Sequence, residues 1–299
     1  NKEYPIYTRK YMNLEAEEEI LIDVNELAKD YDYYQVSGIS ISPDNKKMAF
    51  GVDTLSRRIY TIKVKDLGTG KMYPEKIHGV NSYTTWASDS KTMFYTGKDE
   101  QTLRSDKIFR HTLGESQDDD TLVYEEKDET FSTYVYPSKS REYIMISSTS
   151  TMATEYRFIS SKTPLESFKV IQKRERGLEY SPSHVGDMFY ISTNIDESTN
   201  FKLVKTPITS TEKSNWKDVI PHREDVLIED TDFFNDFMVI GERSNGLLKI
   251  RIKSWDGKED YYLNLSSQFD FENEVYSASI GYNPNFQTNF LRYSYTSLT

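Results

Sequence analysis

This 299-residue chain has few side chains that could bind a metal ion or act as a thiol nucleophile, and the spacing of its histidines does not suit a metal site. The four histidines, His78, His111, His184 and His222, are at least 33 residues apart. None has a partner at the His-x-x-x-His spacing of zinc enzymes. The chain has no cysteine, which excludes disulfides, thiolate nucleophiles and cysteine-based zinc sites. The sequence therefore predicts neither a metal nor a cofactor.

A catalytic serine is not recognisable either. The nearest match to the G-x-S-x-G nucleophile elbow is residues 38–42, centred on Ser40, which lack the second glycine and lie within a predicted strand. The acidic run at residues 118–120 lacks the glycine and the distal glutamate of a calcium loop, and we interpret it as a solvated loop. No catalytic residue is assigned.

The elements around these residues are short strands separated by turns. A strand, a turn of Asp, Asn or Ser, and a second strand recur about every 45 to 50 residues, which is the period of propeller blades. The chain also begins with two predicted strands, at 4–10 and 18–24, and one helical turn within 25–30. The second strands of the repeats are predicted at 48–52, 92–96, 143–147, 188–192, 237–241 and 290–295.

We predict an all-β fold, a β-propeller of the seven-bladed type with four-stranded antiparallel blades, incomplete at both ends. Two half blades and five full blades give seven positions, or six if the halves pair as one blade. The predicted blades are 36–80, 82–127, 131–173, 178–222 and 226–267, with partial blades at 1–35 and 275–299.

Charged residues gather in particular loops of this arrangement. In a propeller, the loop between the second and third strands of a blade lies on the same face as the connections between blades. We predict that this face docks another domain, although ordinary solvated turns remain an alternative. The residues assigned to it are Arg57, Arg58, Glu125, Arg174, Arg176, Glu179, Arg223, Glu224 and Asp225.

Composition limits the possible partners and the compartment. The net charge is −11, from 37 basic and 48 acidic residues, which argues against a nucleic-acid partner. No run approaches the roughly 18 apolar residues of a membrane span. The cysteine-free composition fits a reducing cytoplasm, with the periplasm left open.

Several segments in chain order resemble the propeller of the prolyl oligopeptidase family, and within it the peptidases that cleave after Arg or Lys. The match runs along almost the whole chain, which makes it more specific than any single motif. The segments include LIDVNELA at 21–28, SPD at 42–44, SRR at 56–58, VYEEKD at 123–128, RERG at 174–177, VIPHR at 219–223 and WDG at 255–257.

The resemblance implies a two-domain serine peptidase acting on short basic peptides. A C-terminal α/β-hydrolase domain would carry the Ser, Asp and His, while the propeller covers the active site and excludes large proteins. The hydrolase domain is then absent from this sequence, and the 299 residues alone are expected to be inactive. The other hypothesis is a non-enzymatic propeller scaffold that binds a protein partner on the same face.

Overall fold

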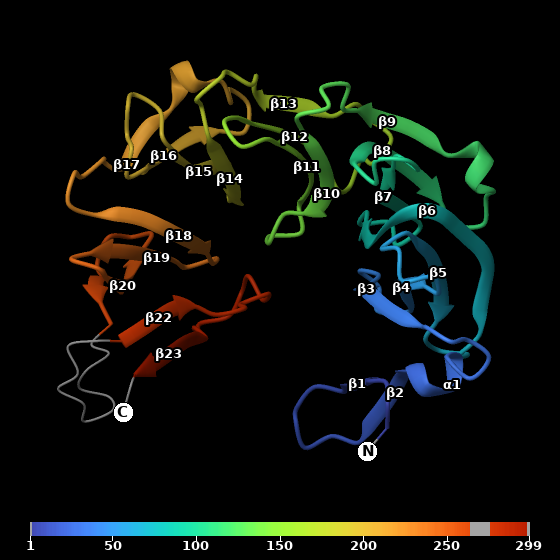
Figure 1. Cartoon of the computed structure of the whole chain (residues 1–299). Helices are drawn as coiled ribbons and strands as arrows, with labels where there is room; N and C mark the ends of the chain where they lie inside the picture. The colour runs from blue at the N-terminus through green and yellow to red at the C-terminus, as the bar shows by residue number, and fades with distance from the viewer. Residues whose placement is uncertain (1, 264–275, 298–299) are drawn as a thin grey trace. The chain divides into compact units, whose positions relative to one another are not determined.

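The computed structural model describes residues 2–263 and 276–297, which form antiparallel strands with few exceptions (Figure 1). The exceptions in this range are the helix α1, Val24–Leu27, and the 3-10 turns η1, Gln117–Asp119, and η2, Lys213–Asn215. The predicted all-β class is confirmed, and so is the helical turn that follows the second strand.

The described strands form six sheets. The first pairs β1 (Ile6–Lys10) with β2 (Glu18–Asp23). The second runs in chain order through β3 (Gln35–Ile41), β4 (Lys47–Asp53), β5 (Tyr60–Asp66), β6 (Met72–Trp86), β7 (Thr92–Lys98), β8 (Ser105–Thr112) and β9 (Thr121–Glu125). The third contains β10 (Ser132–Pro137), β11 (Tyr143–Thr149), β12 (Thr154–Ser160) and β13 (Lys169–Gln172).

The remaining sheets follow in chain order. The fourth contains β14 (Tyr180–Val185), β15 (Met188–Thr193), β16 (Lys202–Pro207) and β17 (Lys217–Ile220). The fifth contains β18 (Leu227–Phe233), β19 (Phe237–Ser244), β20 (Leu247–Ser254) and β21 (Asp260–Tyr262). The sixth pairs β22 (Tyr276–Ile280) with β23 (Tyr293–Ser297).

The contacts divide the chain into two compact units. Unit 1 comprises Asn1–Tyr136, Ile144–Ser148 and Ile159–Phe168. Unit 2 comprises Pro137–Tyr143, Thr149–Phe158 and Lys169–Thr299.

The strands form where apolar and polar residues alternate or where an apolar run is covered on both faces. In β5 the buried positions are Tyr60, Ile62 and Val64, and the residues between them are partly exposed. In β4 the whole run from Met48 to Val52 is buried. The period of two residues therefore sets which side of each strand contributes to the core.

Five of the six expected second strands are confirmed, in β4, β7, β11, β15 and β19. The sixth, expected over 290–295, begins only at Tyr293. The reason is that the backbone N–H of Arg292 donates to Oδ1 of Asn283 at 2.7 Å. This N–H is then not available to a strand ladder, whereas the carbonyl of Arg292 accepts from the backbone N–H of Gly281 at 2.9 Å and from Nδ2 of Asn283 at 3.0 Å.

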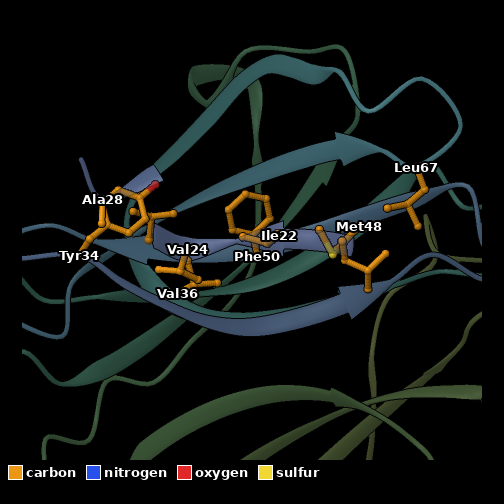
Figure 2. Packing of buried hydrophobic residues seen from close by; sticks show 10 residues of the cluster. Ile22, Val24, Ala28, Tyr34, Val36, Met48, Phe50 and Leu67 are labelled. Atoms are coloured by element: carbon orange, nitrogen blue, oxygen red, sulfur yellow. The ribbon is translucent and has the colours of Figure 1, made fainter. Parts of the chain in front are cut away.

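The core at the start of unit 1 joins the first two sheets. Ile22 and Val24 pack on Val36, Met48 and Phe50, and all five are less than 8% exposed (Figure 2). Burying a side chain of this size contributes roughly 1.5–3 kcal/mol. This cluster therefore attaches the β1–β2 hairpin to the strands that follow it.

The predicted boundary between blades at residues 80–82 lies inside the continuous strand β6. The pairing register of β6 with β7 shifts between Val80 and Thr84. The first half of β6 pairs mainly with β5, and the second half pairs with β7. Other predicted blade ends, at 264–267, 275 and 298–299, lie outside the described residues.

Candidate functional surface

The loop between β4 and β5 carries two residues of the predicted face, Arg57 and Arg58. A buried carboxylate shapes this loop, because Asp53 is 1% exposed and accepts from the backbone N–H of Leu55 at 2.8 Å and of Arg58 at 2.7 Å. Both arginine side chains are exposed and make no ion pair with another residue of the described range. The loop therefore presents two free guanidinium groups from a fixed backbone.

Lys98 adds a third positive charge beside this loop. Its Nζ donates to the backbone carbonyl of Arg58 at 2.6 Å. Burial and the nearby charge of Arg58 lower the pKa of Lys98, although Asp53 acts in the opposite direction. The structure thus groups Arg57, Arg58 and Lys98 into one cationic patch in unit 1.

Glu125, the third predicted residue of unit 1, is the last residue of β9 and is exposed. It lies opposite Lys107 in the ladder between β8 and β9. The next residue, Glu126, is only 4% exposed and was not assigned a role from the sequence.

In unit 2, the linker from β13 to β14 carries Arg174, Arg176 and Glu179. Arg174 turns inward to the strands, where its guanidinium lies 3.4 Å from Oε1 of Glu155 and its backbone N–H donates to Oε2 of the same side chain at 3.0 Å. Glu155 is 5% exposed and also accepts from Arg157. Arg174 therefore has a buried anionic partner within its own unit.

The rest of this linker borders a small pocket of about 410 Å³. Arg176 is exposed at its edge, while Glu179 is half-buried and accepts from Nδ2 of Asn194 at 3.3 Å. Asp196 lines the other side and forms an ion pair with Lys202 at 3.0 Å. Arg176 is thus the outward-facing cation of this linker.

The linker from β17 to β18 carries Arg223, Glu224 and Asp225. Arg223 donates to Oε1 of Glu242 at 2.6 Å, and Arg251 reaches the same oxygen at 3.3 Å. The hydroxyl of Tyr262 donates to Oε2. Burial opposes ionisation of Glu242, but the hydrogen bonds from Arg223 and Tyr262 together lower its pKa.

Glu224 and Asp225 remain exposed, and their side chains make no ion pair with described residues. The predicted residues therefore fall into two groups. The outward-facing ones are Arg57, Arg58, Glu125, Arg176, Glu224 and Asp225. Arg174 and Arg223 have internal carboxylate partners, and Glu179 bonds Asn194.

The buried glutamates that bind these arginines were not predicted from the sequence. Glu155 is the second residue of β12, and Glu242 lies within β19, directly after an apolar run. A carboxylate inside an apolar strand is the available signal, since a buried charge needs a partner.

The acidic run at 118–120 is only partly the solvated loop that was expected. The side chain of Asp120 is 2% exposed and binds Nδ1 of His111 at 2.6 Å and the hydroxyl of Tyr95 at 2.7 Å. That interpretation was wrong for Asp120 because the C-terminal end of η1 turns it toward the buried ends of β7 and β8. It fits Asp118 and Asp119, which are exposed.

The remaining candidates for chemistry are structural. Ser40 lies in β3 opposite Ala49, and its carbonyl accepts from the indole N–H of Trp86 at 3.1 Å. Within residues 2–263 and 276–297 there is no group of three or more His, Asp or Glu side chains that could bind a metal ion. None of the described helices is long and apolar enough to cross a membrane.

Comparison with known proteins gives one consistent result. The family profile described as "Prolyl oligopeptidase, N-terminal beta-propeller domain" matches residues 1–299. The chain is 39% identical over 284 residues to dipeptidyl aminopeptidase BI of Pseudoxanthomonas mexicana, with 95% of this chain and 38% of that protein covered. It is 30% identical over 305 residues to protease 2 of Moraxella lacunata, with 100% and 42% covered.

Among solved structures, oligopeptidase B from Leishmania major superimposes with a TM-score of 0.87 at 25% identity. The aligned part covers 97% of this chain and 41% of that one. The chain thus spans about two fifths of the length of the curated relatives it matches.

Proposed function

The chain belongs to the prolyl oligopeptidase family as an N-terminal β-propeller domain, and on this premise we propose that it is the size filter and lid of a serine peptidase of the oligopeptidase B type. The parent enzyme would cleave short peptides after Arg or Lys. The observation that carries the proposal is the similarity along the whole chain to protease 2 and to oligopeptidase B, of which the chain spans about two fifths.

In this proposal the propeller takes part in no covalent step. A hydrolase domain of the same polypeptide supplies a serine nucleophile, a histidine base and an aspartate for acyl transfer. We infer seven blade positions, or six if the β1–β2 and β22–β23 hairpins pair as one blade. It covers the active site, excludes water during the reaction and admits only short chains.

The outward-facing charges are the proposed contact with the hydrolase domain. Arg57 and Arg58 are free to bind carboxylates there, while Glu125, Glu224 and Asp225 are free to bind cations. Exposed ion pairs contribute only about 0.2–1 kcal/mol each, so several must act together to stabilise a closed state. Such weak contacts suit a lid that must reopen.

The experiment is to express the complete gene product and assay it with two reporter amides. One has a blocked N-terminus and Arg before the scissile bond, and the other is a dipeptide with a free amine. Cleavage of the blocked reporter, abolished in the Ser→Ala variant of a G-x-S-x-G elbow in the hydrolase domain, supports the proposal. Cleavage of the dipeptide alone would favour an activity like that of dipeptidyl aminopeptidase BI.

The absence of any hydrolysis, with no hydrolase domain encoded in the gene, would favour the scaffold instead. The cysteine-free composition fits a cytoplasmic location for the parent, with the periplasm as the alternative, and fractionation of the source cells distinguishes the two.

A further inference from the structure

One arginine in unit 1 bonds the segment that connects two sheets. Arg104 lies just before β8, and its side chain is 19% exposed. Its Nη1 donates to the backbone carbonyls of Glu126 at 3.2 Å, Asp128 at 3.3 Å and Phe131 at 3.0 Å, and its Nη2 donates to Glu126 at 3.2 Å. These carbonyls belong to residues 126–131, which join β9 of the second sheet to β10 of the third.

The segment 126–131 is folded around a second buried charge. The carboxylate of Glu126 accepts from the backbone N–H of Asp128 at 3.0 Å and from the hydroxyl of Tyr124 at 2.6 Å. The Tyr124 hydroxyl in turn accepts from Oγ of Ser148, in β11, at 3.1 Å. The network therefore continues from the second sheet, through the linker, into the third.

The planar guanidinium of Arg104 suits this position. It offers five N–H donors in a planar fork, so one side chain can reach three carbonyls at once, whereas a lysine ammonium is a compact point charge. Asp106, 6% exposed, lies 3.9 Å from Nη2, and its Oδ2 also forms a closer ion pair with Lys107 at 3.0 Å. Hydrogen bonds from an ionised donor are also stronger than neutral ones.

Side chains bind the other linkers in a similar way, with different groups. In unit 2, Nδ2 of Asn200 donates to the carbonyls of Arg223 at 3.1 Å and Glu224 at 2.7 Å. The neutral amide makes two bonds there, while the cation Arg104 makes contacts with three carbonyls. The attachment by Arg104 is accordingly the stronger of the two.

We propose that Arg104 sets the upper size of the substrates admitted by the parent enzyme, because its bonds hold the segment 126–131 that joins β9 to β10. This inference rests on the proposed function. A propeller excludes large chains only while neighbouring sheets stay together, and the frequency of local opening depends on the few bonds that close the linker. The apolar cluster of Phe94, Ile108, Val135 and Ile144 also joins these sheets, so the fold survives without the arginine.

The test uses the complete gene product with Arg104→Lys and, as a milder change in the same network, Tyr124→Phe. Arg9→Lys is the matched control, because Arg9 bonds Glu19 within the β1–β2 hairpin and touches no linker. The readouts are hydrogen exchange of residues 126–131, thermal melting, and kcat/KM for a short blocked Arg reporter and for a denatured protein.

For Arg104→Lys we expect the amides of 126–131 to exchange about tenfold faster, because the charged bonds that close the linker are lost. Cleavage of the denatured protein should rise several-fold relative to the reporter, with reporter kinetics and melting close to wild type. Tyr124→Phe should show the same change more weakly, and Arg9→Lys should show none.

Unchanged exchange and an unchanged ratio of long to short substrate in both variants would overturn the inference. Faster exchange with an unchanged ratio would also overturn it, because the linker would then open without admitting larger chains. Failure of the proposed function is distinct, since it removes hydrolysis of the reporter in the wild-type protein.

Discussion

Glu242 binds two arginines and a tyrosine at one end of the fifth sheet, although it is 1% exposed. Removing its charge leaves the guanidiniums of Arg223 and Arg251 without their shared partner. We expect Glu242→Gln to lower the free energy of unfolding by about 2–3 kcal/mol, below the 3–5 kcal/mol of fully buried pairs because both arginines reach solvent. Urea denaturation of the complete gene product measures the change.

Glu224→Gln is the control for that substitution, because its side chain is exposed and makes no ion pair with described residues. It should change the free energy of unfolding by less than about 0.5 kcal/mol. Equal effects of the two variants would mean that the network around Glu242 contributes nothing to stability.

Asp260 should make the stability of the fold depend on pH in the acid range. The hydrogen bond from Arg251, together with Lys253, lowers its pKa from 3.8 to about 2. Because the folded pKa lies below the unfolded one, the stabilisation is present above pH 3.8 and is lost as the pH falls toward about 2. Urea midpoints measured across this window should fall more steeply for the wild type than for Asp260→Asn.

Asp225→Asn provides the reference for that titration, since Asp225 is exposed and makes no ion pair with described residues. Its midpoints should fall as steeply as those of the wild type. An Asp260→Asn protein with the wild-type slope would contradict the assignment.

At the scale of residues, the sequence allowed the loop positions of Arg174 and Arg223 to be predicted, but not their partners. Turn residues and apolar alternation are local signals, so they place both arginines between strands. Glu155 and Glu242 are each 19 residues away in the chain and come into contact only through strand pairing. Partner choice of this kind depends on register, which the sequence pattern does not fix.

At the scale of elements, the second sheet depends on the contact between β3 and β6 at Gly38. Gly38 has φ +66°, and an added Cβ would lie 2.1 Å from the carbonyl oxygen of Ser82. We expect Gly38→Ala to destabilise the fold by about 2–4 kcal/mol, from the left-handed backbone and from overpacking against a backbone atom. Thermal and urea unfolding measure this cost.

Gly70→Ala separates the cost of the left-handed backbone from the cost of overpacking. Gly70 has φ +73°, and nothing lies within 4 Å of the added Cβ. This substitution should cost only about 1–2 kcal/mol, the penalty for the left-handed backbone. If both variants lost the same stability, the approach of β6 to β3 would not require glycine.

Elements that depend on local patterns could be predicted from the sequence, whereas those that depend on contacts such as Gly38–Ser82 could not. Single strands such as β4 and β19 follow from apolar runs and turn chemistry within a few residues. The continuity of β6 across the expected boundary at 80–82 does not, because it results from a register shift and from the close approach of Ser82 to Gly38 and Gly51. The number of blades likewise depends on how sheets assemble, which a repeat period indicates without determining.

At the scale of the whole molecule, the cationic patch of Arg57, Arg58 and Lys98 is the surface on which the proposed docking can be tested most directly. The loop backbone is fixed by the buried Asp53, so replacing Arg57 and Arg58 by Ala removes charge from the surface and leaves the strands intact. Two exposed pairs contribute together up to about 2 kcal/mol, so the closed state should become several-fold less populated.

In the complete gene product, the double variant should therefore show altered kcat/KM for the blocked Arg reporter and a weaker dependence on salt, with an unchanged melting temperature. Salt screens the exposed pairs of the wild type, so at high ionic strength the kcat/KM values of the wild type and the variant should become equal. Lys46→Ala with Lys71→Ala makes the same charge change at the other end of β4 and β5, and it should behave as wild type. Kinetics and salt dependence that match between the Arg57/Arg58 variant and this control would exclude the patch from the docking surface.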